Sequence, residues 1–207
     1  MKEILALKLT EDGSISFTVH PLIIIVVAVL IGGIYWWRRR SILRDWETVQ
    51  IEVPFGGGKV TIKPNHEVLK IAHQAWTELI TRKVGLEFDE DHDVIVEVYD
   101  SWYAVFKEIR SLIKSVPAQK LRESFDAQKL SEVLIDTLNK GLRPHLTQWQ
   151  ARFRRWYAVE LDKYPDLSPQ EIQKQFIGYA ELVTDLKKVN HQMIQFAEEL
   201  RKIVRPS

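Results

Sequence analysis

The chain of 207 residues contains no cysteine, which excludes disulfides, thiol nucleophiles and thiolate metal sites. This absence suits a domain that works in a reducing cytoplasm. An excess of either charge is also missing, because 29 lysines and arginines stand against 28 aspartates and glutamates. A strongly basic surface for nucleic acids is therefore excluded, and any such site must be a local patch.

Charge is absent altogether from positions 19–37, a nearly continuous aliphatic run that ends in Tyr-Trp-Trp and is followed at once by three arginines at 38–40. Roughly 20 apolar residues cross a bilayer core as a helix. Aromatic residues typically lie at the headgroups, and arginines mark the cytoplasmic end. The pattern predicts a single-pass transmembrane helix at 19–37 with the N-terminus outside. A cleaved signal peptide is the alternative, but no small-residue cleavage site follows the run.

Small residues stand inside this expected transmembrane helix. Ala28 and Gly32 are four positions apart, with Gly33 beside them, and this spacing lets membrane helices approach closely. The run lacks the intramembrane charge that marks an ion pathway. A pore made from several copies would therefore be apolar and gated by dewetting. An inert tether explains the same composition, so both interpretations remain open.

The segment before the membrane, residues 1–18, is expected to form an extracytoplasmic β-hairpin. Alternating runs at 4–9 and 14–19 flank Asp12-Gly13, and this dipeptide between such runs is a strong hairpin signal. A lone hairpin is marginal in water. We therefore expect it to pair with copies of itself or to lie on the membrane.

Residues 38–64 follow the expected membrane helix and combine the basic segment with a second predicted hairpin. Its strands at 48–53 and 59–62 are separated by Pro-Phe-Gly-Gly-Gly. The Gly-Gly-Gly-Lys-Val-Thr sequence only superficially resembles a phosphate loop, because Val60 separates Lys59 from Thr61 and a strand follows where a helix is required.

The remaining residues, 65–207, show helical periodicity and predict a cytosolic helical bundle. Asn65 is expected to cap the first helix, and Asp93 the second, after an acidic loop that we interpret as solvated. Gly141 is expected to follow the end of the third helix, and Pro144 to begin the fourth. A capping box at Ser168 is expected to open the last helix. The predicted helices are at about 65–84, 94–116, 126–139, 144–164 and 168–204.

The last predicted helix has a regular apolar stripe. Its members alternate spacings of four and three and are Ile172, Phe176, Tyr179, Val183, Leu186, Asn190, Met193, Ala197, Leu200 and Val204. Such a seam is typical of a coiled coil, whereas a wider stripe is typical of one helix packed in a bundle. Both an intramolecular core and a subunit interface fit the pattern. Asn190 falls on the seam, where a buried amide can fix the register of a homo-oligomer interface.

The strongest candidate site is the segment 143–157, RPHLTQWQARFRRWY. Indoles stack on bases, and guanidinium groups pair with phosphates. We predict a strip that binds an oligonucleotide or another anion and consists of Arg143, His145, Trp149, Arg152, Arg155 and Trp156. The neighbouring helix face, which can enter the core, carries Leu146, Phe153, Tyr157 and Leu161. In the alternative interpretation the tryptophans are core residues and the arginines bridge carboxylates; lipid headgroups are a further possible ligand.

Residues that would assemble an enzyme active site are not recognisable. The six histidines are scattered, and His66 and His73, which share a helix face, are too far apart for adjacent metal ligands. A metal held by His92 and the acidic loop is a minor alternative to the solvated loop. We therefore predict no catalytic residues, no metal and no cofactor.

The layout resembles the membrane effector of bacterial antiphage defence systems of the Hailong type. The similar features are one pass at 19–37, a helical cytosolic body, and the cluster of Trp149, Arg152, Arg155 and Trp156. The resemblance implies an oligomeric ion channel in the bacterial inner membrane. It also implies a partner nucleotidyltransferase whose oligodeoxyadenylate product holds the channel closed. The alternative function is a membrane-tethered scaffold that recruits a cytosolic protein.

Overall fold

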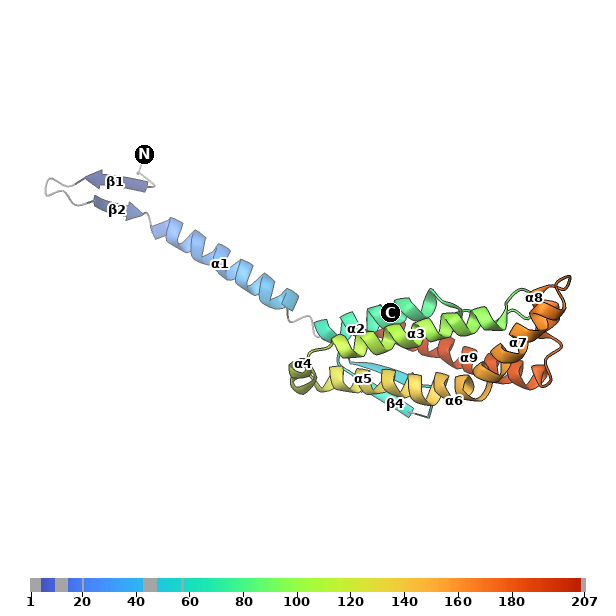
Figure 1. Cartoon of the computed structure of the whole chain (residues 1–207). Coiled ribbons are helices and arrows are strands. Elements are labelled where there is room, and N and C mark those ends of the chain that lie inside the picture. Colours follow the sequence, from blue (N-terminus) through green and yellow to red (C-terminus); the bar gives the residue numbers. More distant parts are fainter. Residues whose placement is uncertain (1–4, 10–14, 20, 43–47, 57, 206–207) are drawn as a thin grey trace. The chain divides into compact units, whose positions relative to one another are not determined.

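The structure, a computed structural model, describes residues 5–9, 15–19, 21–42, 48–56 and 58–205. The chain divides into two compact units, residues 1–46 and 47–207 (Figure 1). The described part is mainly helical, as predicted, with two separate two-stranded antiparallel sheets. The turn expected at Asp12-Gly13 lies outside the described residues.

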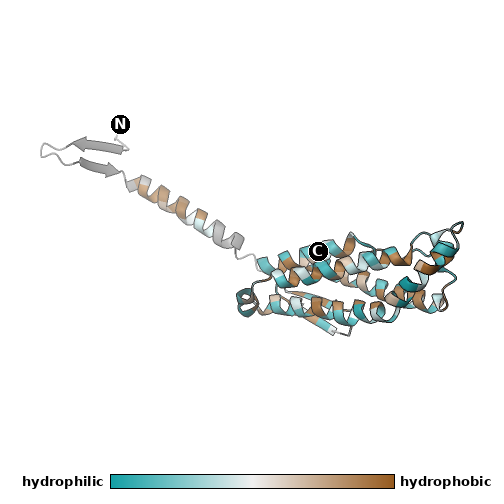
Figure 2. Cartoon of the chain, in the orientation of Figure 1, coloured by the Kyte–Doolittle hydropathy of each residue, from teal (hydrophilic) through white to brown (hydrophobic). Residues whose placement is uncertain are grey.

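The first unit contains a hairpin followed by one long helix. Strand β1 (Leu5–Leu9) pairs with β2 (Ile15–Val19), and the register places Leu5 opposite Val19. Helix α1 (Pro21–Ile42) continues through the three arginines at 38–40. Its described side chains are those of Leu22 and positions 24–36, and its large apolar ones are between 46% and 67% exposed. Figure 2 shows this helix as hydrophobic along most of its coloured length.

Within the described residues, no helix is both long enough and apolar enough to cross a bilayer.

The second unit begins with the other predicted hairpin. Strand β3 (Val49–Val53) pairs with β4 (Gly58–Ile62), and Val49 lies opposite Ile62. Alternate residues of β3 are buried, and Ile51 and Ile62 are fully so. The hairpin thus has one face on the core and one toward solvent, as period-two patterning requires.

Two long helices follow, and their starts are set in different ways. Helix α2 (His66–Ile80) is capped by Asn65, as predicted, because its side-chain oxygen accepts a hydrogen bond of 2.9 Å from the backbone N–H of Val68. Helix α2 ends earlier than expected, and a 3₁₀ turn, η1 (Lys83–Gly85), carries the chain onward. Helix α3 spans Ile95–Ser115.

The expectation that Asp93 caps α3 is wrong. Its carboxylate instead accepts a hydrogen bond of 2.6 Å from Lys83. The buried backbone N–H of Ile95 is satisfied from a distant part of the chain, since the side-chain oxygen of Gln173 accepts its hydrogen bond at 2.9 Å. The amide nitrogen of Gln173 also donates to the carbonyl of Asp93, at 2.9 Å. This fully buried glutamine is a cap supplied by tertiary structure rather than by local sequence.

The predicted break between the third and fourth helices is also wrong. A short helix, α4 (Ala118–Glu123), precedes one continuous helical segment that runs from Phe125 to Lys163. Gly141 and Pro144 lie inside this long helix. Its successive parts are α5 (Phe125–Asp136), the π-helical η2 (Thr137–Leu142), α6 (Arg143–His145), the π-helical η3 (Leu146–Gln150) and α7 (Ala151–Lys163).

The final expected helix is divided in two. Ser168 and Glu171 form the predicted capping box at the start of α8 (Pro169–Gln173). The chain then turns, and Gly178, with a φ of +95°, precedes α9 (Tyr179–Val204). A positive φ is strained for other residues, so glycine at this position breaks the helix.

Helix α9 packs against α2 and β3, and its apolar stripe is buried within the chain. Of the two predicted roles for the stripe, an intramolecular core and a subunit interface, the structure shows the intramolecular core.

Candidate functional site

The two π-helical segments flank a three-residue part of the long helix, Arg143–His145, which contains Pro144. Pro144 has no N–H to donate to the preceding turn, and its ring would collide with the carbonyl of Lys140 in a regular α-helix. The wider π-helical turns relieve this conflict, so the helix continues through the proline. Interruptions of this type are frequently located at functional sites.

Gly141, in the first π-helical segment, packs against Phe55 in the turn of the β3–β4 hairpin. A Cβ atom at position 141 would lie only 2.7 Å from Cε1 of Phe55. Glycine at this position avoids a collision, because a side chain would push the Phe55 ring away. A glycine within a helical pattern was the sequence signal for this contact.

His145 is buried at the centre of a hydrogen-bond network. Its Nδ1 lies 2.7 Å from Oδ2 of Asp185, and its Nε2 lies 3.1 Å from the hydroxyl of Tyr99. The indole N–H of Trp149 donates to the same Asp185 oxygen at 3.1 Å. Because an ionised carboxylate only accepts, Nδ1 carries the proton of the neutral ring and Nε2 accepts from Tyr99.

The environment of this network favours the neutral forms of His145 and Tyr99, which lie around the carboxylate of Asp185. Burial is the main cause that lowers the pKa of His145 below its ordinary value, although Asp185 opposes this effect. Burial, with a smaller contribution from Asp185, raises the pKa of the Tyr99 hydroxyl. The histidine is therefore uncharged at neutral pH, and the tyrosine keeps its proton. The Asp185 side chain is 36% exposed and offers an acceptor to solvent or to a ligand.

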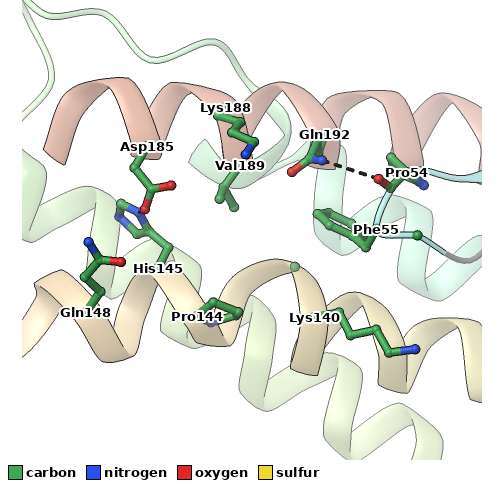
Figure 3. Close-up of a pocket in the computed structure, with 12 residues that line it drawn as sticks. Pro54, Phe55, Lys140, Pro144, His145, Gln148, Asp185, Lys188, Val189 and Gln192 are labelled. Atoms are coloured by element: carbon green, nitrogen blue, oxygen red, sulfur yellow. Dashed lines mark hydrogen bonds and ion pairs between the residues drawn. The ribbon is translucent and has the colours of Figure 1, made fainter. Parts of the chain in front are cut away.

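A cleft of about 320 Å³ opens beside this network, between the long helix, α9 and the β3–β4 turn (Figure 3). Asp185 and His145 lie at one end, and Pro54 and Phe55 at the other. Lys140 is already paired with Asp136 at 2.8 Å. The cleft is lined by Pro54, Phe55, Gly56, Lys140, Gly141, Pro144, His145, Gln148, Asp185, Lys188, Val189 and Gln192.

The cleft offers polar groups that could contact a small polar ligand. The volume is at the lower end of the range for ligand sites. Lysine and glutamine side chains supply donors, and Asp185 supplies an acceptor. Among the described residues, no group of three or more His, Asp or Glu is placed to hold a metal ion.

The predicted indole strip is not a free surface. Trp149 is only 7% exposed and donates its N–H to Asp185. Trp156 is half-buried, with its ring centroid 5.1 Å from that of Phe176. The two tryptophans therefore pack in the core, as the alternative interpretation predicted. Their rings could stack on bases only if the core opened. Leu161, expected to enter the core, is exposed.

The predicted arginines remain exposed but do not form one strip. Arg152 donates to the carbonyl of Ile177 at 3.1 Å, and its guanidinium group lies 5.7 Å from the Trp149 ring. Arg143 lies 5.1 Å from the ring of Phe106, on the side of the helix that faces α3. Arg155 makes no polar contact with the described residues.

Asn190, expected at a subunit interface, is instead buried inside the chain. Its side-chain oxygen accepts from the N–H of Phe88 at 3.0 Å. Its amide nitrogen donates to the carbonyls of Lys83, Val84 and Leu86 at 3.2, 2.9 and 3.0 Å. The residue therefore fixes the segment after α2 onto α9 and has no capacity left for a second copy.

The expected helix-packing residues Ala28, Gly32 and Gly33 lie on α1. A Cβ atom added at either glycine would meet no atom of the chain within 4 Å.

Sequence reasoning missed Asp185 and Tyr99, which no local pattern distinguishes from surface and core residues.

Compared with known protein families, curated proteins and solved structures, the chain matches none.

Proposed function

We propose that the chain is a single-pass membrane protein whose helical body works in the cytoplasm, at the inner membrane of a bacterium. The observation that carries this proposal is α1, because its apolar side chains are exposed on every face. A helix that is hydrophobic all round needs a buried environment, and a bilayer supplies one. The uncharged run of the sequence extends over 19–37, beyond the side chains described in α1, and approaches the length of a bilayer core.

We further propose that it is a homo-oligomeric effector, an ion channel gated by a nucleotide or oligonucleotide signal, in antiphage defence. The resemblance in layout supports this role. Because the indoles are packed in the core, the signal would be held through its phosphates by the exposed residues Arg143, Arg152 and Arg155. Since these arginines do not form one strip, each would contact a different phosphate. A partner nucleotidyltransferase would supply it.

The test is ion flux through liposomes that contain the full-length protein, with and without short single-stranded DNA. We expect the oligonucleotide to change the flux. Three phosphate contacts would make the logarithm of the binding constant fall by about 2 for each tenfold rise in salt. Arg152→Glu with Arg155→Glu should abolish the response, whereas Lys163→Glu on the same helix should not. Flux that never responds to oligonucleotide would contradict the proposal.

A membrane-tethered scaffold is the second candidate, and one observation favours it. Ile177 is 84% exposed at the turn before α9. Burial of this aliphatic side chain against a protein partner would remove its apolar surface from water. Cross-linking in cells should then capture a partner that Ile177→Ser loses, while the liposomes show no flux.

A further inference from the structure

A second hollow of about 320 Å³ lies on the other side of the long helix, between that helix and α3. Helices α3 and α5 lie side by side in the body (Figure 1). The groove has an apolar floor and a basic rim. Its floor includes Phe106 and Ile113 of α3, and its rim carries Arg110, Lys114 and Arg143.

The charge on this rim is not neutralised by the chain itself. Three cations and no carboxylate are found among the described residues that line the groove. Within the described part of the chain, neither Arg110 nor Lys114 has a carboxylate at ion-pair distance. Asp136, on the preceding helical part, is engaged by Lys140 at 2.8 Å. Such a concentration of like charge is unusual here, since the chain as a whole has a net charge of only +1.

Exposed apolar side chains accompany these cations. Ile135 lines the groove and is 41% exposed. Tyr103 is 60% exposed and precedes Phe106 and Arg110 by one and two helical turns, so it lies on the same face of α3. Cations interleaved with exposed aromatic and aliphatic groups are typical of surfaces that lie against lipid headgroups.

We propose that this groove binds the phosphate headgroup of an anionic phospholipid in the membrane that anchors the chain. This inference rests on the proposed membrane anchor. Eleven residues, 38–48, separate the proposed span from the body, and even fully extended they reach at most about 40 Å. Arg110 and Lys114 would pair with the phosphate, while Tyr103 and Ile135 meet the acyl boundary. Charge complementarity and this short connection favour a lipid over a soluble anion.

The absence of cysteine allows a direct test with the full-length protein. Tyr103→Cys would be labelled with an environment-sensitive fluorophore and reconstituted into vesicles of phosphatidylcholine with increasing phosphatidylglycerol. Val159→Cys, 50% exposed on α7, is the matched control. We expect a blue shift and a rise in intensity at position 103 that depend on phosphatidylglycerol, with no change at position 159.

Arg110→Glu with Lys114→Glu should remove this response. Each cation near an anionic membrane contributes about fivefold to binding, so the double reversal should weaken binding of the groove to phosphatidylglycerol membranes by about 25-fold or more. An unchanged melting temperature would show that the double variant is folded. A signal that does not depend on phosphatidylglycerol, or that survives the double reversal, would overturn the proposal.

Two further measurements distinguish a lipid phosphate from a soluble one, and a failure of the groove proposal from a failure of the anchor proposal. A response at position 103 to nucleotide or oligonucleotide in pure phosphatidylcholine, without one to phosphatidylglycerol, would assign the groove to a soluble ligand and overturn the lipid proposal. Flotation with phosphatidylcholine vesicles tests the anchor alone. Flotation only with phosphatidylglycerol, lost on double reversal, would support the groove and refute the anchor; flotation with neither lipid would refute both.

Discussion

Two long helices, α1 and α9, are of similar length but have opposite surroundings. Helix α1 has 22 residues and exposes its large apolar side chains by 46–67%. Helix α9 has 26 residues and buries Leu186 and Leu200 completely. The difference lies in pattern, since α9 confines its apolar residues to a stripe whereas α1 has them all round. A stripe can be satisfied by one neighbour in the same chain, but an all-round apolar surface cannot.

The largest effect is expected from breaking the polar anchor of α9. Asn190→Leu keeps the helix apolar but leaves one N–H and three carbonyls without their partner. At about 1 kcal/mol or more for each group, unfolding in urea should show a loss of about 4 kcal/mol. Gln195→Leu removes only a surface hydrogen bond to His191 and should change stability by less than about 0.5 kcal/mol. Equal effects of the two would contradict the role of Asn190.

A charge in α1 should have a different consequence. Val27→Lys lies near the middle of the uncharged run and should cost about 3 kcal/mol of membrane insertion. The variant should move from the membrane pellet to the supernatant in carbonate extraction, while Val159→Lys on α7 stays with the membrane. If Val27→Lys remained membrane-bound, the contrast between the two helices would have another cause.

Sequence patterns predicted the features that depend on neighbouring residues. The Asn65 cap, the Ser168 capping box and both hairpins are local, and each is present. The cap of α3 could not be predicted, because its donor is satisfied by Gln173, 78 positions away. Likewise, nothing local identifies Asp185 as the partner of His145.

The candidate strip was misplaced because the helix is not regular. The buried residues His145, Trp149, Phe153 and Tyr157 recur every four positions. In an α-helix of 3.6 residues per turn such a series drifts by about 40° at each step, so the spacing assigned them to different faces. The π-helical turn at 146–150 widens the helix and compensates for part of this drift. Proline is a recognisable cause of irregularity, but its position predicts a break as readily as a π-helical turn.

Within the long helix, Gly141→Ala should have a moderate effect. Alanine normally stabilises a helix by about 1 kcal/mol relative to glycine. Here the added Cβ would collide with Phe55, and overpacking of this kind costs roughly 1–3 kcal/mol, so a net loss of about 1 kcal/mol is expected in thermal or urea unfolding. Phe55→Leu in the same protein should recover the normal gain. Additive effects of the two substitutions would contradict the contact.

The smallest expected effect is on the pH dependence of the stability of the body. Because burial lowers the pKa of His145, its neutral form stabilises the fold fully above the ordinary pKa of 6.5, and this contribution is lost as pH falls below that value. His145→Gln should flatten the fall in unfolding free energy on acidification.

His92 is the matched control for this measurement. Asp89 raises the pKa of His92, so its contribution has the opposite sign, present below 6.5 and lost as pH rises through the higher folded value. His92→Gln should therefore leave the acid-side loss of stability at least as steep. A flattening by His92→Gln, and none by His145→Gln, would refute the assignment.

The β3–β4 hairpin has a mechanical consequence. Val49 and Ile62 form the terminal pair of its ladder, so a load applied where β3 begins, against a body held through α2, would open the ladder one bond at a time rather than shear it. Glu199 and Gln192 of α9 brace β3 by accepting from Glu52 and donating to Pro54. A pull along the chain would therefore reach the Phe55–Gly141 contact last. Under tension, the strands of the hairpin would therefore separate before the long helix is distorted.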